Sequence, residues 1–206
     1  DKASEIGRFP RLFRNAESIP PGLTWPTMTF EGHMTVDLGN LEVHLMQVGR
    51  GHTKGDTIAW LPKQKILFAG DLVEYQSPPY AGDCYFREWP RTVDRLGDFK
   101  AEQMVPGRGP ALKNATEVRQ ALAGTRAFLT DLYSSVQQGA AAGKDLKTIY
   151  RETYDFMKPR YADWVIFDHC MPFDVSRAYD EVNGHEDPRI WTAERDLEMW
   201  KHLEGQ

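Results

Sequence analysis

Apolar and polar residues alternate along two neighbouring stretches of the chain, which predicts strands rather than helices. Residues 34–38 and 41–48 alternate on either side of Gly39-Asn40, and this dipeptide is typical of a two-residue turn. The stretch therefore predicts a β-hairpin. The first 30 residues, by contrast, are rich in Pro, Arg and aromatic residues without a sustained period, which favours a loop lying over a surface.

A second pair of strands is indicated by residues 57–61 and 66–69, which are almost continuously apolar and flank a turn at residues 62–65. Near-continuous apolar strands are typical of a sheet that is covered on both faces. Residues 104–105 end the β-rich part. A short helix is expected between these strands, at residues 88–96.

Beyond Asn114 the apolar residues recur every three or four positions, which predicts helices. Asn114 with Glu117 resembles a capping box, and the apolar stripe continues to Gly139. Further helices are predicted at residues 145–158, stopping before Pro159, and at 174–182 and 192–203. The chain therefore divides into a β-rich portion, residues 1–113, and a helical portion, residues 114–206, packed on the same domain.

Composition supports a folded domain and excludes several partners. The chain has 206 residues, of which 41% are hydrophobic and 12% aromatic, enough for a packed core. A net charge of −5 argues against nucleic acid as a partner, and no apolar run approaches the roughly 20 residues that span a bilayer.

The two cysteines, Cys84 and Cys170, are expected to be free thiols, and a cytoplasmic location is favoured. The chain starts at Asp1 without an initiator methionine, so processing, trimming or a fragment is open.

The candidate chemistry lies after two of the predicted strands. His52 stands in a loop flanked by Gly51 and Gly55, and Asp71 follows the strand at residues 66–69. Imidazole and carboxylate are ligands of hydrolytic zinc sites, and loops at strand ends hold such ligands. Thr53 and Asp56 are candidates to orient the His52 ring by accepting its other proton, or to cap the loop backbone.

These segments resemble the second half of the metallo-β-lactamase superfamily. The resemblance covers about residues 34–112 and is carried by three motifs: Gly51-His-Thr-Lys-Gly-Asp-Thr, residues 60–71 ending in Gly70-Asp71, and Val105-Pro-Gly-Arg-Gly. It implies an α/β fold, namely the C-terminal half of an αββα sandwich, followed here by a helical C-terminal extension. It also implies that His52 is a metal ligand and that Asp71 is a metal ligand that bridges two metals in the family.

Two departures from the family pattern change the expected site. The leading H-x-H-x-D-H motif is absent, because none of the six histidines has that spacing. Arg108 stands where the family has a second histidine ligand, and a guanidinium has no lone pair to donate. One zinc ion is therefore expected rather than two, with iron or manganese as alternatives. Arg108 either grips an anionic group of a substrate or forms a structural salt bridge that neutralises Asp71.

The function implied by the resemblance is metal-dependent hydrolysis, in which a metal-activated water attacks an ester, thioester, lactone or lactam. Asp71 and Arg108 are the expected catalytic residues, and the substrate is a small molecule that carries an anionic group. The alternative is a degenerate member that has lost its metal and acts as a structural or partner-binding domain. Because half a sandwich exposes apolar surface, a homodimer or a missing N-terminal segment is expected.

Other residues are weaker candidates. Glu74, Tyr75, Tyr80 and Asp83 follow Asp71 in a segment expected to lie mostly at the surface near the substrate mouth. His169 is expected at a junction between helix and loop, either lining a pocket or packed beside aromatic residues, and Cys170 has no activating partner. An aromatic stripe is expected in the core: Tyr150, Tyr154, Tyr161, Trp164 and Phe167.

Overall fold

In the computed structural model, which describes residues 26–189 and then 192, 194, 197, 199 and 201, five strands form one sheet. They are β1 (His33–Asp37), β2 (Glu42–Met46), β3 (Ile58–Leu61), β4 (Ile66–Glu74) and β5 (Gln103–Arg108). The first four pair antiparallel in chain order, and β5 pairs parallel with β4. Both predicted hairpins and the late strand are confirmed.

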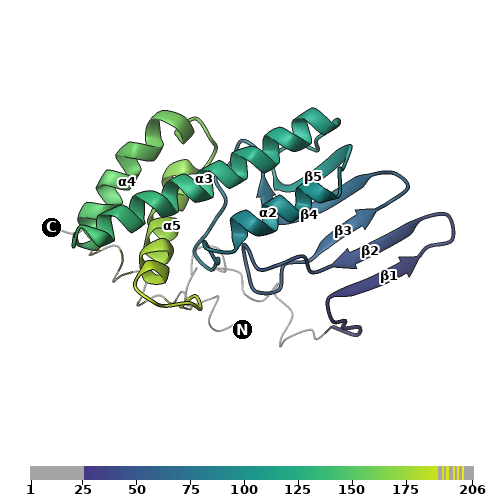
Figure 1. Cartoon of the computed structure of the whole chain (residues 1–206), viewed down its shortest axis with the longest axis horizontal. Coiled ribbons are helices and arrows are strands. Elements are labelled where there is room, and N and C mark those ends of the chain that lie inside the picture. Colours follow the sequence, from purple (N-terminus) through teal and green to yellow (C-terminus); the bar gives the residue numbers. More distant parts are fainter. Residues whose placement is uncertain are drawn as a thin grey trace, which may run out of the picture.

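The helices of the described part are α2 (Trp89–Asp98), α3 (Ala115–Ala141), α4 (Leu146–Tyr161) and α5 (Phe167–Val182). Figure 1 shows α2 and α3 beside the sheet, and α4 and α5 together at the end of the molecule far from β1. The long α3 connects the two regions, because it packs against α2, β4 and β5 as well as against α4 and α5. This mixed α/β arrangement confirms the expected fold class.

The two faces of the sheet differ in burial. Leu67 of β4 and Met104 of β5 are register partners and are fully buried on the face that α2 and α3 cover. Phe68 and Val105 are the next pair of partners, and they stay 41% and 37% exposed on the opposite face. Because side chains alternate between the faces of a sheet, the helices cover only one face of this pair of strands.

The start of α3 follows the predicted capping pattern. The side chain of Asn114 accepts hydrogen bonds from the backbone N–H groups of Thr116 and Glu117, at 3.1 and 3.0 Å. The Glu117 carboxylate reaches back to the N–H of Lys113 at 2.7 Å. These bonds satisfy donors that have no partner inside the helix, which is why the start was readable from sequence.

Two helix boundaries differ from the prediction. The helix predicted to stop before Pro159 continues to Tyr161, since burial of Met157 and Tyr161 outweighs the backbone hydrogen bond that proline removes. The helix predicted from residue 174 begins at Phe167, seven residues earlier, without a polar N-cap and with Pro172 inside it. Residues 1–25 and most of the predicted helix at 192–203 lie outside the described residues.

The segment between β4 and α2, residues 75–88, is held by one face of α5. Asp174 accepts a hydrogen bond from the N–H of Ala81 at 2.6 Å, and Arg177 donates to the carbonyl of Cys84 at 2.7 Å. Glu181 accepts from the N–H groups of Phe86 and Arg87, at 2.9 and 3.0 Å. Positions 174, 177 and 181 lie on one side of a helix. This face of α5 therefore supplies buried charged partners for the backbone of residues 81–87.

Both cysteines of the described part are buried and free, as the sequence predicted. Burial raises the pKa of both thiols, that of Cys170 to about 12, so neither is a ready nucleophile. Among the described residues, no helix combines the length and apolar character needed to cross a bilayer.

Replacing Arg177 with methionine should destabilise the protein by about 3–5 kcal/mol, because Glu181 and the Cys84 carbonyl lose a buried cationic donor. Arg126→Ala is the matched control, since Arg126 pairs with Asp94 at the surface and should cost less than about 1 kcal/mol. Urea unfolding of both variants measures the difference. Equal losses would show that the buried network adds little.

Candidate active site

The loop that carries His52 is fixed by close packing of its first residue. Gly51 lies so near the core that an added Cβ would approach Leu72 Cδ2 to 2.4 Å and Trp89 Cδ1 to 2.8 Å. The Gly51 carbonyl also accepts a hydrogen bond from Tyr85 N–H at 2.9 Å. Glycine is therefore required here because the backbone passes against other side chains.

Trp89 and Asp56 set the surroundings of the His52 ring. The indole of Trp89 meets the imidazole edge-on with 5.9 Å between ring centroids, and it donates to the Leu72 carbonyl at 3.0 Å. Asp56 accepts from the N–H and hydroxyl of Thr53, at 3.0 and 2.7 Å. Its carboxylate stays 3.9 Å from Nδ1 of His52, beyond hydrogen-bond distance. Of the two expected roles of Asp56, the structure bears out the backbone cap.

Asp71 stands where the pairing of β4 with β5 becomes irregular. The register shifts between Gly70 and Glu74, and Gly70 adopts a positive φ of 53°. Gly107 of β5 packs directly on Asp71, since an added Cβ would lie 2.1 Å from Oδ1 of the carboxylate. The irregular register and this close contact hold the Asp71 carboxylate at the end of the strand pair.

The structure brings His52 and Asp71 together. Nε2 of His52 lies 3.7 Å from Oδ2 of Asp71, too far for a hydrogen bond. Two ligands at about 2.0–2.2 Å from one tetrahedral zinc ion lie roughly 3.3–3.6 Å apart. The pair therefore fits two positions of one metal site.

The rest of a ligand set is not found in the part of the chain that the structure describes. There, no group of three or more His, Cys, Asp or Glu side chains lies close enough to hold a metal ion. Catalytic zinc sites use three protein ligands, so the described residues offer a pair of candidate ligands and not a complete centre.

Arg108 points to a different carboxylate from the one expected. Its Nη1 donates to Oε1 of Glu74 at 2.7 Å, and the Glu74 side chain is fully buried while that of Arg108 is 37% exposed. The hydrogen-bonded partner of Arg108 is thus Glu74 and not Asp71, which corrects the expected salt bridge. Sequence alone did not show this partner because the extension of β4 to residue 74 was not predicted.

Burial dominates the electrostatics of Glu74. Loss of hydration raises the pKa of its carboxyl from 4.5 to about 8, although Arg108 acts in the opposite direction. Oε2 of the same carboxyl is buried without a hydrogen-bond partner among the described residues. One short ion pair therefore does not compensate for removing this carboxyl from water.

The segment after Asp71 is more buried than expected. Glu74 is buried, and Tyr75, Tyr80 and Asp83 are partly buried rather than exposed. The reason is the set of buried hydrogen bonds from α5, which draws this segment into the interior. His169 lies in the first turn of α5, and its ring packs beside that of Phe173 with 5.6 Å between centroids, as one of the two expectations for it had it.

The aromatic stripe of the helical part packs in the interior, as expected. Trp164 stacks on Phe128 at 5.8 Å between centroids and meets Tyr161 edge-on at 4.9 Å. Tyr161 and Phe167 are buried, and Tyr150, Tyr154 and Trp164 pack against the core.

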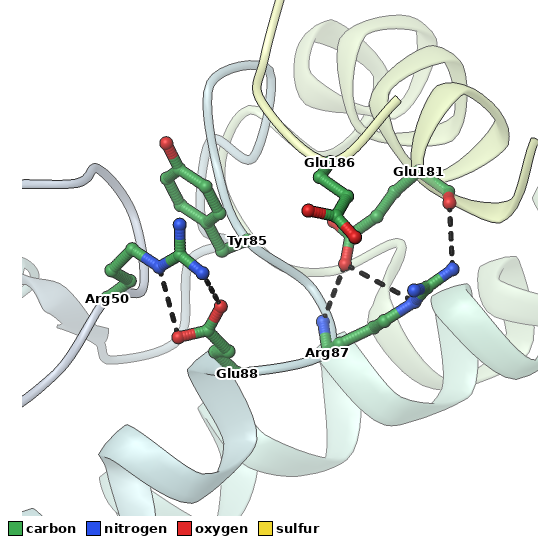
Figure 2. Close-up of a pocket in the computed structure, with 6 residues that line it drawn as sticks. All are labelled: Arg50, Tyr85, Arg87, Glu88, Glu181 and Glu186. Atoms are coloured by element: carbon green, nitrogen blue, oxygen red, sulfur yellow. Dashed lines mark hydrogen bonds and ion pairs between the residues drawn. The ribbon is translucent and has the colours of Figure 1, made fainter. Parts of the chain in front are cut away.

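A pocket lies behind the His52 loop, lined by Arg50, Tyr85, Arg87, Glu88, Glu181 and Glu186. Figure 2 shows that its arginines face acidic groups of the same pocket. Arg50 pairs with Glu88, and Arg87 bonds to Glu181 through both its backbone and its side chain. These contacts engage both arginines of the pocket, and Arg50 immediately precedes the His52 loop, so the pocket contributes to the support of that loop.

Comparison with known proteins finds relatives of part of this chain. The metallo-β-lactamase type 2 of Bacteroides fragilis is 31% identical over 93 residues, 43% of this chain and 37% of that protein. The type 2 enzyme of Bacillus cereus is 30% identical over 95 residues, 43% of this chain and 36% of that protein. The chain thus spans little more than a third of the length of these relatives. No family model matches the chain.

Among solved structures, the stereoselective inverting sec-alkylsulfatase of a Pseudomonas species matches with a TM-score of 0.61. Its identity is 15%, and the match covers 77% of this chain and 27% of that one, so it supports the fold alone. The sequence relatives, taken alone, support membership of the matched part of the chain in the metallo-β-lactamase superfamily. The predicted family resemblance is confirmed over this partial region.

Stability should fall as the pH rises from about 4.5 to about 8, because folded Glu74 keeps its proton while the unfolded chain releases it. Arg108, Asp71 and Cys170 are the charged or titratable groups linked to this carboxyl. Glu74→Gln should make stability less dependent on pH across this window. Urea unfolding at several pH values tests this, and an unchanged slope in the variant would contradict it.

Proposed function

We propose that the protein is a hydrolase of the metallo-β-lactamase superfamily in which His52 and Asp71 are two ligands of one zinc ion. The observation that carries the proposal is the 3.7 Å approach of Nε2 of His52 to Oδ2 of Asp71. Further ligands would come from outside the described residues. The chemistry that such an ion supplies is a water of lowered pKa for attack on an ester, thioester, lactone or lactam.

The residues around the pair suit a binding role. Trp89 and Gly51 fix the imidazole from one side, and Gly107 fixes the Asp71 carboxylate from the other. Positioned in this way, the two groups need little rearrangement when a ligand binds. The name metallo-β-lactamase, carried by both sequence relatives, supports the same class of reaction.

Arg108 has a proposed role in binding the substrate. Glu74 engages one nitrogen of the guanidinium, while the side chain remains 37% exposed. A permanently charged group held in this way can pair with an anionic group of a substrate. Glu74 then acts as a positioning residue for Arg108.

The second candidate function is a degenerate, non-catalytic member of the same superfamily. The ion pair between Arg108 and Glu74 favours it, because this arginine stands at the place of a ligand histidine and is used inside the protein. The two functions differ in one measurable property, the ability to bind metal.

Metal analysis of the purified protein after metal-supplemented expression separates the two functions. We expect close to one equivalent of zinc, iron or manganese, and a loss of metal affinity of at least about tenfold in His52→Ala and in Asp71→Asn. His33→Ala is the matched control, since His33 is an exposed histidine of β1. Less than about a tenth of an equivalent in the wild-type protein would favour the non-catalytic function.

The ion pair of Arg108 makes a further substitution informative. At a pH above about 8, where Glu74 is charged, Arg108→His alone should lower stability by about 2 kcal/mol or more, because it leaves the buried carboxylate without its cation. Adding Glu74→Gln should restore much of this loss, since a neutral amide needs no counter-ion. Unfolding curves of the single and double variants measure the coupling, and additive effects would contradict it.

A further inference from the structure

A row of aromatic rings connects the proposed metal ligand His52 to α5. The ring centroids of His52 and Tyr80 lie 6.5 Å apart, those of Tyr80 and Phe173 lie 5.4 Å apart, and those of Phe173 and His169 lie 5.6 Å apart. We call these four residues the aromatic row. The successive rings are tilted by 53–59° and lie within the range of favourable aromatic contact.

The two halves of the aromatic row are fixed relative to each other. Ala81, the residue after Tyr80, donates its N–H to Asp174, the residue after Phe173, at 2.6 Å in the interior. Arg177 holds the same segment through the Cys84 carbonyl. The position of Tyr80 against Phe173 therefore follows from buried hydrogen bonds and not only from contact between the rings.

Exposure along the row is graded. The His52 side chain is 18% exposed, Tyr80 and Phe173 are partly buried, and His169 is exposed. A surface of this kind can still bury aromatic area when an apolar group covers it, which is a favourable process. The aromatic row begins at His52 in the candidate site and extends away from it to His169 of α5.

Arg108 lies close to the start of the aromatic row. It follows Gly107, which packs directly on Asp71, and Asp71 lies 3.7 Å from Nε2 of His52. The backbone of Arg108 also accepts a hydrogen bond from the N–H of Tyr75 at 3.1 Å, in the segment that leads to Tyr80. A cation therefore stands near the end of the row that His52 occupies.

We propose that the substrate is an organic anion with an aromatic or extended apolar group, which the aromatic row binds while Arg108 pairs with the anionic group. This inference rests on the proposed site and adds the class of molecule that the site accepts. α5 then determines substrate preference, because it supplies Phe173 and His169 and holds Tyr80 in place.

Binding of two sulfonates to the full chain tests the inference without requiring turnover. Naphthalene-2-sulfonate and methanesulfonate share an anionic group and differ in apolar area, so calorimetric titration should show the former binding at least about tenfold more tightly. Phe173→Leu, which keeps apolar volume, should reduce this preference about fivefold. Phe156→Leu is the matched control, because Phe156 is 51% exposed on α4, and it should leave the preference unchanged.

Arg108→Gln separates the two parts of the site. It should weaken both sulfonates by a similar factor and leave the preference for the aromatic one intact. Equal affinities in the wild-type protein, no binding of either anion, or a preference that survives both Phe173→Leu and Tyr80→Leu would overturn the inference. A preserved preference in a protein that binds no metal would instead overturn the proposed hydrolase and leave the aromatic row as a binding surface.

Discussion

The buried charged face of α5 is the constraint on which the candidate site depends. Asp174, Arg177 and Glu181 bond to four backbone groups within residues 81–87, which lie between β4 and α2. That segment in turn carries Tyr85, which bonds to the loop of His52, and leads into Trp89, which packs on the imidazole. The helical portion therefore shapes chemistry that is borne by the β-rich portion, although none of its residues is a proposed metal ligand.

The family resemblance predicts a histidine at position 108, where this chain has an arginine. The Arg108 guanidinium donates a hydrogen bond to the buried carboxyl of Glu74. The cost of burying Glu74 is visible in its raised pKa and in its unpaired oxygen. Retaining such a costly pair is easier to understand if Arg108 has a task beyond packing, which is the reason for giving it a role in substrate binding.

Much of the fold could be predicted from local pattern. The two hairpins and the start of α3 depend on alternation, a turn dipeptide and a capping residue, which are signals within a few positions of each other. The early start of α5 was missed because Ile166 offers no side-chain cap and Pro172 interrupts the helical pattern, while burial against distant residues stabilises the helix.

For the candidate site too, local motifs predicted some residues, and contacts between distant residues were not predictable. His52 and Asp71 were predictable because short motifs carry them, and the structure does bring them together. The partner of Arg108 lies 34 positions away, and the aromatic row joins residues of the β-rich and helical portions, so no local pattern shows either.

The connection between β4 and β5 carries several of the residues discussed above. β4, α2 and the parallel strand β5 form a single crossover, and within it lie Asp71, Glu74, Tyr80 and Arg108. One continuous stretch of chain thus carries the two carboxyl groups, the cation and one ring of the aromatic row, while His52 and the two rings of α5 reach the site from outside this crossover.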